Sequence, residues 1–175
     1  AALLDLISSH LTPDAHGRNT ICSLYLDTPD HLIIRNSIIA RTYKEKLRLR
    51  SYAQAASDEV VFAELKKKYR GVVYKRRLAL PQQEAMAWLT GGPPPGEDSQ
   101  IRREIDYFLR YYGALRPTVF LSYERQAWYC RDGGDFRVTF DDNILCRRTD
   151  LSLESAVGGT PILDEGLVPV SYTHL

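Results

Sequence analysis

Alternating charge in the segment Arg41–Tyr52 (RTYKEKLRLRSY) is the feature that most limits how this chain can fold. Residues two apart in a strand point to the same face of a sheet. The spacing therefore predicts a strand with Lys46, Arg48 and Arg50 on one face and leucines on the other. A row of fixed positive charge on one wall of a sheet is costly unless an anion or water lies beside it.

The same alternation recurs in four later segments that we predict to be strands. The side chains that it places on the charged face are Glu64 and Lys66 in Glu59–Arg70, Lys75 and Arg77 in Val72–Leu80, Tyr123 and Arg125 in Pro117–Arg131, and Arg137, Thr139 and Asp141 in Phe136–Leu145. In any single segment, the pattern is more typical of an antiparallel strand with one solvated face than of a binding surface. Because five segments share it, the pattern favours a charged surface that these strands build together.

The formal charge of +1 hides a strong asymmetry along the 175 residues. The segment 41–77 holds 12 of the 23 Lys and Arg residues but only 4 of the 22 acidic ones, so it carries +8 and the rest of the chain −7. A local excess of this kind indicates an anionic ligand more than a generally basic surface.

Length and composition predict one domain, or a fragment of one, in the cytoplasm. The three cysteines lack the spacing of metal ligands and suit free thiols in a reducing compartment. No apolar run approaches the roughly 20 residues of a membrane helix, so we expect no membrane segment in this chain.

Six strand-like segments with helices between them predict an α+β fold. The expected strands are Thr20–Asp27, Arg41–Tyr52, Glu59–Arg70, Val72–Leu80, Pro117–Arg131 and Phe136–Leu145. The expected helices are one that ends near Leu11, then His31–Asn36, Gln82–Thr90 and Gln100–Tyr112, with Thr12–Asn19 as a polar loop. An antiparallel sheet with charge on its inner face requires closure or near-closure, so we expect a β tunnel with the helices packed outside.

Basic side chains in this number suit a ligand with several phosphates, because arginine binds phosphate oxygens as a fork and lysine supplies a point charge. Glu64 is the one carboxylate within the basic set and is either a metal ligand or a charge balancer. A nucleic-acid surface is the competing interpretation. We place Tyr43, Tyr52, Tyr69 and Tyr74, which could stack bases, off the parity of the cations, and this disfavours nucleic acid.

Six short motifs resemble those of a known family. They are SLYLDTPD, KLRLRSY, VFAELKKK, YKRRLAL, LSYERQAW and FRVTFDDNI, in this order between Ile21 and Ile144. This combined set is similar to the VTC domain, the catalytic domain of vacuolar transporter chaperone polyphosphate polymerases, in the triphosphate tunnel (CYTH-like) superfamily. The resemblance implies an eight-stranded antiparallel tunnel with a divalent metal, Mn²⁺ or Mg²⁺. It also implies that polyphosphate grows from the γ-phosphate of ATP.

The resemblance also implies roles for residues that the alternation had already selected. Phosphate binding and catalysis fall to Arg48, Arg50, Lys66, Lys75, Arg125 and Arg137. The alternation by itself adds Lys46, Arg77 and Tyr123 as further substrate contacts and Glu64 as the candidate metal ligand, whereas the family's metal-binding glutamate usually lies on a late strand. The implied partners are ATP and polyphosphate, with no nucleic acid.

Both ends of the chain depart from the family pattern. The chain begins inside the first family helix, and the strand expected after Pro161–Leu167 is not continued by Ser171–Leu175 (SYTHL). We therefore expect residues 1–170 to be a truncated tunnel domain and residues 171–175 to be a non-native tail. The parent protein would be the polymerase, and this fragment would be inactive. The alternatives are a tunnel triphosphatase acting on inorganic or organic triphosphate, and a non-catalytic polyphosphate-binding module.

Overall fold

The computed structural model describes residues 6, 8–164 and 166–174, within which three helices accompany one antiparallel sheet. The helices are α2 (Leu32–Ile39), α3 (Gln82–Leu89) and α4 (Gln100–Tyr112). The strands are β1 (Leu11–Asp27), β2 (Tyr43–Ser51), β3 (Val60–Tyr69), β4 (Val72–Pro81), β5 (Arg116–Cys130), β6 (Phe136–Arg147), β7 (Thr160–Pro161) and β8 (Val170–His174). The α+β class that the sequence predicts is confirmed.

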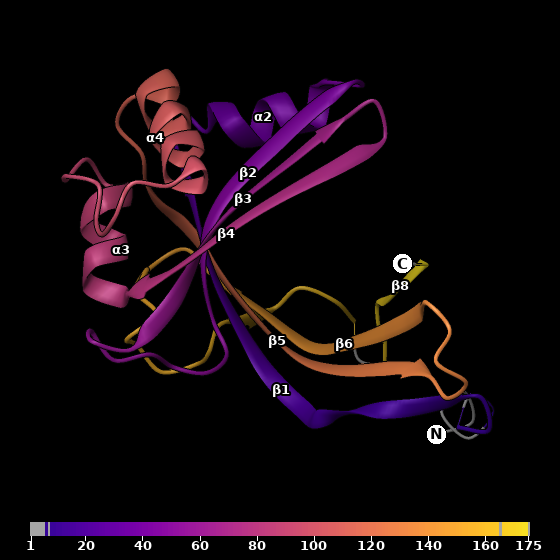
Figure 1. Ribbon diagram of the computed structural model, residues 1–175. Helices are drawn as coiled ribbons and strands as arrows, with labels where there is room; N and C mark the ends of the chain where they lie inside the picture. The colour runs from indigo at the N-terminus through magenta and orange to yellow at the C-terminus, as the bar shows by residue number, and fades with distance from the viewer. Residues whose placement is uncertain (1–5, 7, 165, 175) are drawn as a thin grey trace.

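The sheet is open within the described part of the chain. Its strands run in the order β4-β3-β2-β1-β5-β6-β7, and β8 pairs with β6. Each pair is antiparallel, as predicted. Strand β4 forms one edge and β7 and β8 lie at the other, so hydrogen bonds do not close these strands into a barrel. Figure 1 shows that β2–β4 and β5–β6 diverge from a common crossing, which gives a strongly twisted sheet.

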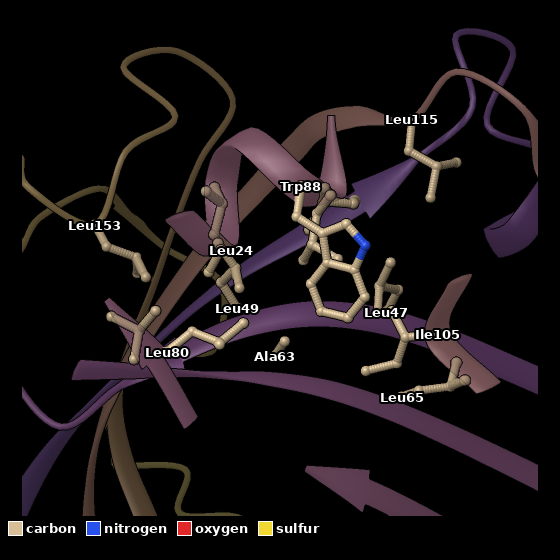
Figure 2. Packing of buried hydrophobic residues seen from close by; sticks show 14 of the residues in the cluster. Leu24, Leu47, Leu49, Ala63, Leu65, Leu80, Trp88, Ile105, Leu115 and Leu153 are labelled. Carbon is tan, nitrogen blue, oxygen red and sulfur yellow. The ribbon is translucent and has the colours of Figure 1, made fainter. Parts of the chain in front are cut away.

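The hydrophobic core lies between one face of the sheet and the helices. Leu24, Leu47 and Leu49 are fully buried there, and Trp88 of α3 and Ile105 of α4 pack over them (Figure 2). All three helices cover this face at the β1–β4 half of the sheet (Figure 1). The other face of the same strands is therefore left for the charged residues that alternate with these leucines.

Local signals set the ends of the helices. The Ser99 side chain accepts a hydrogen bond at the start of α4, and Gly113, with a φ of 73°, ends that helix. The buried Asp27 carboxylate accepts hydrogen bonds from the backbone N–H groups of Ile33 (2.9 Å) and Ile34 (3.0 Å) and so fixes the start of α2. None of the helices in the described ranges has the length and apolar composition of a membrane span.

The N-terminal expectation needs one correction. Residues Thr12–Asn19 do not form a separate polar loop but belong to β1, which pairs with β5 on both sides of a register break between Pro13 and Arg18. The strand extends this far because Leu11 is 5% exposed and packs in a small second core with Val138. The helix expected at the start of the chain falls mainly on residues 1–5 and 7, which lie outside the described residues.

The C-terminal segment also differs from the expectation that it would not continue a strand. Val170–His174 forms β8, which pairs with β6 from Phe136↔His174 to Phe140↔Val170. Strand pairing uses backbone groups that every non-proline residue carries, so an exposed edge of β6 can accept this segment whatever its side chains. The non-native origin of residues 171–175 stays a prediction.

Candidate functional site

The alternation of β2 separates charged from apolar side chains as predicted. Leu47 and Leu49 are fully buried under the helices, whereas Lys46 is exposed and Arg48 is half-buried on the other side of the strand. We call this other side of β2, β3 and β4 the cation face. Its charged residues are Lys46, Arg48, Arg50, Glu64, Lys66, Lys75 and Arg77.

The centre of the cation face is Glu64, whose carboxylate binds arginines from both neighbouring strands. Oε2 accepts a hydrogen bond from Arg48 Nε at 2.7 Å and lies 3.7 Å from Arg50 Nε. Oε1 accepts a hydrogen bond from Arg77 Nε at 2.8 Å. Burial acts to raise the pKa of Glu64, but the charges of Arg48 and Arg50 outweigh it and lower the pKa below 4.5. Glu64 is therefore an anion held among three cations.

Aromatic side chains hold the same arginines from the outside. Arg48 Nη1 donates to the Tyr25 hydroxyl at 3.0 Å, and Arg50 Nη2 donates to the Tyr123 hydroxyl at 3.2 Å. Arg77 lies over the Phe62 ring, 4.5 Å from its centroid. These contacts join β1 and β5 to the β2–β4 cluster and fix the guanidinium groups in place.

One tyrosine corrects the sequence interpretation. We expected Tyr52 off the parity of the cations, but its hydroxyl accepts a hydrogen bond from Arg77 Nη2 at 3.0 Å on the cation face. Its position two residues after Arg50 was the signal for this placement. Tyr25 is a second site residue that sequence reasoning missed. It alternates with Leu24 and Leu26 in a predicted strand, so it shares with Ser23 the face opposite the apolar one.

Three lysines form a second row beside the Glu64 cluster. Lys46, Lys66 and Lys75 lie opposite one another in register on β2, β3 and β4. In the described part of the chain, no carboxylate oxygen lies within 4.0 Å of their ammonium groups. Burial, and then the charges of Lys75 and Lys46, lower the pKa of Lys66 below its ordinary value of 10.5. This row carries positive charge that the protein itself does not neutralise.

The two remaining predicted arginines lie on β5 and β6. Arg125 lies over the Tyr123 ring at 5.1 Å and donates to both oxygens of Asp141, at 2.6 and 2.7 Å, so its charge is already paired. Arg137 lies over Tyr129 at 5.1 Å. Arg137 is four residues from Asp141 on the same strand, so it lies about 13 Å from the carboxylate that pairs with Arg125.

The structure therefore brings most, but not all, of the predicted site together. Hydrogen bonds, ring contacts or direct strand register connect nine residues into one surface: Lys46, Arg48, Arg50, Glu64, Lys66, Lys75, Arg77, Tyr123 and Arg125. Arg137 shares the face of β6 with Asp141 but has no contact with this surface among the described residues. Its role stays a prediction.

The described carboxylates do not fit the divalent metal that the family resemblance implies. No group of three or more His, Cys, Asp or Glu side chains that could hold a metal occurs in the described ranges. Glu64 and Asp141, the carboxylates of this surface, each bind arginine with short hydrogen bonds. The geometry favours the charge-balancing role of Glu64 over the metal-binding one, and we assign no described residue to a metal.

A cleft of about 720 Å³ adjoins the cation face at its β1 side. Tyr25 and Lys46 line the cleft where it meets the cation face, and Val119 and Leu121 of β5 supply apolar wall. Arg148 adds a further cation. The cleft can therefore hold a group with a flat apolar body beside the lysine row.

Comparison with known families gives the class of protein. The VTC domain family matches residues 2–171, which is nearly the whole chain. The chain therefore belongs to the VTC domain family, as the six motifs predicted. Among curated proteins, no sequence matches.

Two similar chains occur among solved structures. The crystal structure of a "putative adenylate cyclase" (bh2851) from Bacillus halodurans has a TM-score of 0.51 and 17% identity, over 81% of this chain and 65% of that chain. The PH1819 protein from Pyrococcus horikoshii OT3 has a TM-score of 0.39 and 9% identity, over 85% of this chain and 72% of that chain. The chain thus spans about two thirds of the first structure's length, and that likeness shows a shared fold.

Proposed function

We propose that the cation face binds a chain of phosphates, and that the intact protein is a polyphosphate polymerase that uses ATP. The observation that carries this proposal is the row of Lys46, Lys66 and Lys75, which lie in register and form no ion pair with any described carboxylate. Like charges in contact are destabilising unless a counter-charge joins them. A polyanion supplies that counter-charge along the whole row.

The size of the charged surface favours a phosphate chain over a single phosphate. Neighbouring strands are about 4.8 Å apart, so the lysine row spans about 10 Å across β2, β3 and β4. The arginine row of Arg48 and Arg77 lies two residues further along the strands, about 6.8 Å away. One phosphate reaches only part of this area, whereas a triphosphate or polyphosphate contacts both rows.

The two rows suit different parts of phosphoryl transfer. In the proposed reaction, the bond between the γ-phosphorus and the oxygen of ADP breaks, and a bond forms to a terminal oxygen of the polyphosphate chain. Lysines of the free row bind the phosphate oxygens as point charges. The guanidinium groups of Arg48, Arg50 and Arg77, already fixed by Glu64, stabilise the charge that spreads over the oxygens in the transition state.

The cleft beside Tyr25 and Lys46 supports a nucleotide as the phosphate donor. Its apolar wall adjoins the lysine row, so a nucleoside can occupy the cleft while its phosphates extend over the cation face. Inorganic triphosphate would not use this wall. We therefore place polymerase activity with ATP ahead of hydrolysis of inorganic triphosphate.

The direct test is to incubate the intact parent protein with ATP and Mn²⁺ and to separate the products by size. Growth of polyphosphate with matching release of ADP supports the polymerase. Orthophosphate without polymer selects the triphosphatase instead. Tight tripolyphosphate binding without turnover selects a non-catalytic binding module. Absence of tripolyphosphate binding contradicts all three.

Adjacent lysines on opposite faces provide a matched test of the site itself. Lys66 lies on the cation face, whereas Lys67 lies opposite Glu45 in the strand register, on the helix-covered face. Lys66→Ala should weaken tripolyphosphate binding about tenfold, because a charge-assisted contact contributes roughly 1.5 kcal/mol. Lys67→Ala should leave it unchanged. Equal effects of the two variants, or RNA binding that tripolyphosphate does not compete, would contradict the proposed site.

A further inference from the structure

A second pocket lies on the helix-covered side of the sheet, next to the cleft described above. It has a volume of about 330 Å³ and lies between α2, α4 and the start of β2. At its base, the Glu45 side chain is buried, at 8% exposure. The Glu45 carboxylate accepts hydrogen bonds from the hydroxyls of Tyr43 and Tyr112, each at 2.6 Å. Glu45 alternates with Lys46, which confirms that the pocket and the cation face are on opposite sides of β2.

In the described part of the chain the Glu45 carboxylate forms no ion pair, although Lys67 lies opposite it in the strand register. Within the described residues, no Lys, Arg or His nitrogen lies within 4.0 Å of its oxygens, although Lys44 and Lys67 line the pocket. Burial and the hydrogen bonds to Glu45 raise the pKa of Tyr43 and Tyr112 above the ordinary 10, so both hydroxyls remain neutral donors. Buried charges in proteins are ordinarily paired, so this one leaves a cation to be supplied.

The surroundings of the carboxylate favour a cation of organic type. Tyr107 and Tyr111 of α4 stand at the pocket with exposures of 62% and 70%, and the Tyr111 ring lies edge-on to Tyr112 with 4.9 Å between centroids. Aromatic faces attract guanidinium and ammonium groups. Helix α4 ends at Tyr112 and α2 ends at Ile39, so two helix C-termini, which carry partial negative charge, approach the pocket.

We propose that this pocket binds a guanidinium group, with Glu45 as its carboxylate partner and the tyrosine rings beside its plane. An ionised carboxylate has about four lone-pair sites, and the two tyrosines use two of them. The other two suit the paired N–H groups of a guanidinium fork. A divalent metal ion fits less well, because it requires several oxygen ligands and the pocket supplies one carboxylate. The pocket shares Ile33, Ser37 and Glu45 with the cleft beside Tyr25 and Lys46, so the two sites adjoin each other.

Guanidinium groups reach proteins as free small molecules or as arginine side chains of peptides, and one titration distinguishes the two sources. Agmatine and the tripeptide amide acetyl-Gly-Arg-Gly should each be titrated into the whole chain while tyrosine and backbone NMR signals are followed. We expect saturable binding that shifts the signals of Tyr43 and Tyr111. Tighter binding of agmatine identifies a free small molecule, and tighter binding of the peptide identifies an arginine side chain.

Variants make the assignment refutable. Glu45→Gln keeps the size of the side chain and should weaken binding at least about tenfold. Tyr111→Leu should weaken it about threefold without affecting folding, since that ring is 70% exposed. Glu104→Gln, on the same helix but outside the pocket, is the control and should bind normally.

Three results would overturn the proposal. The first is no saturable binding of either probe, and the second is equal binding by Glu45→Gln that is folded by circular dichroism. The third is tetramethylammonium binding as tightly as agmatine, since that ion cannot donate hydrogen bonds to Glu45.

Discussion

Replacing Glu64 with glutamine should make the domain less stable but bind phosphate chains more tightly. In the native protein, the Glu64 carboxylate is the counter-charge for Arg48, Arg50 and Arg77. The side chain of Glu64 is only 12% exposed, so water cannot replace it. Glutamine keeps the shape and one hydrogen-bond acceptor but removes the charge, which leaves three guanidinium groups facing one another.

The structure sets the expected size of both effects. Glu64 accepts short hydrogen bonds from Arg48 and Arg77, and loss of a half-buried charged partner costs about 3 kcal/mol. For a domain of this length, that corresponds to a fall in melting temperature of roughly 6–12 °C. Removing one negative charge from the centre of the cation face should strengthen tripolyphosphate binding by at least about tenfold.

The pH dependence gives an independent check on the same carboxylate. Burial acts to raise the pKa of Glu64, but the arginine charges lower it below 4.5 in the folded state. A carboxylate of this kind contributes stability that is fully present above the unfolded pKa and is lost as pH falls through the folded pKa. The difference in unfolding free energy between native protein and Glu64→Gln should therefore be constant near pH 7 and shrink below about pH 4.5.

Thermal unfolding with and without tripolyphosphate, together with calorimetric titration, measures these effects. Glu104→Gln is the matched control, because Glu104 binds a single arginine, Arg76, on the edge of α4. It should lose less than about 1 kcal/mol and bind tripolyphosphate normally. If folded Glu64→Gln binds tripolyphosphate more weakly than the native protein, the charge-balancing role is wrong. If the weaker tripolyphosphate binding of Glu64→Gln is seen only when Mn²⁺ is present, Glu64 is a metal ligand instead.

Three other predictions test the fold and the lysine row. Arg147→Gln should lower the free energy of unfolding by about 3 kcal/mol and make the loop 148–159 sensitive to protease. The reason is that the Arg147 guanidinium donates to the backbone carbonyls of Asp150, Ser152, Ala156 and Gly158. Arg148→Gln is the control and should have neither effect. Asp27→Ala should lose about 1–2 kcal/mol in chemical denaturation, since Asp27 holds the first N–H groups of α2. Tripolyphosphate affinity, measured by calorimetry, should decline as pH rises towards 10.5, because the pKa of Lys66 is lowered and its charge is lost first; Lys66→Arg should move the decline to higher pH.

The faces of the strands were predictable from the sequence, and the register of one hairpin was as well. Alternation alone separates Lys46 and Arg48 from the leucines between them. Strands β3 and β4 are joined by Arg70 and Gly71, whose φ values of 47° and 89° form a two-residue turn. Such a turn fixes the pairing Tyr69↔Val72 and with it the pairing of Lys66 with Lys75.

Longer-range features of the site were not predictable from alternation. The connection between β2 and β3 runs from Tyr52 to Glu59, and a loop of this length does not fix the register of the two strands. The pairing of Arg48 with Glu64 is therefore known only from the structure. Tyr123 reaches Arg50 across β1, over 73 residues of sequence. Arg147 lies in a strand of mixed pattern, and its four backbone partners follow from the path of the next loop.

If the cation face binds phosphate as proposed, its division into two rows explains how the chain can fold without that ligand and still attract it. If every cation had a carboxylate partner, the surface would be stable but nearly neutral. If none had one, the mutual repulsion of Arg48, Arg50 and Arg77 at short range would oppose folding. Glu64 removes that repulsion where the side chains are most buried and leaves it in the exposed lysine row, where water screens it. The proposed attraction for phosphate therefore lies mainly in the three exposed lysines, because leaving these unpaired costs the folded protein least.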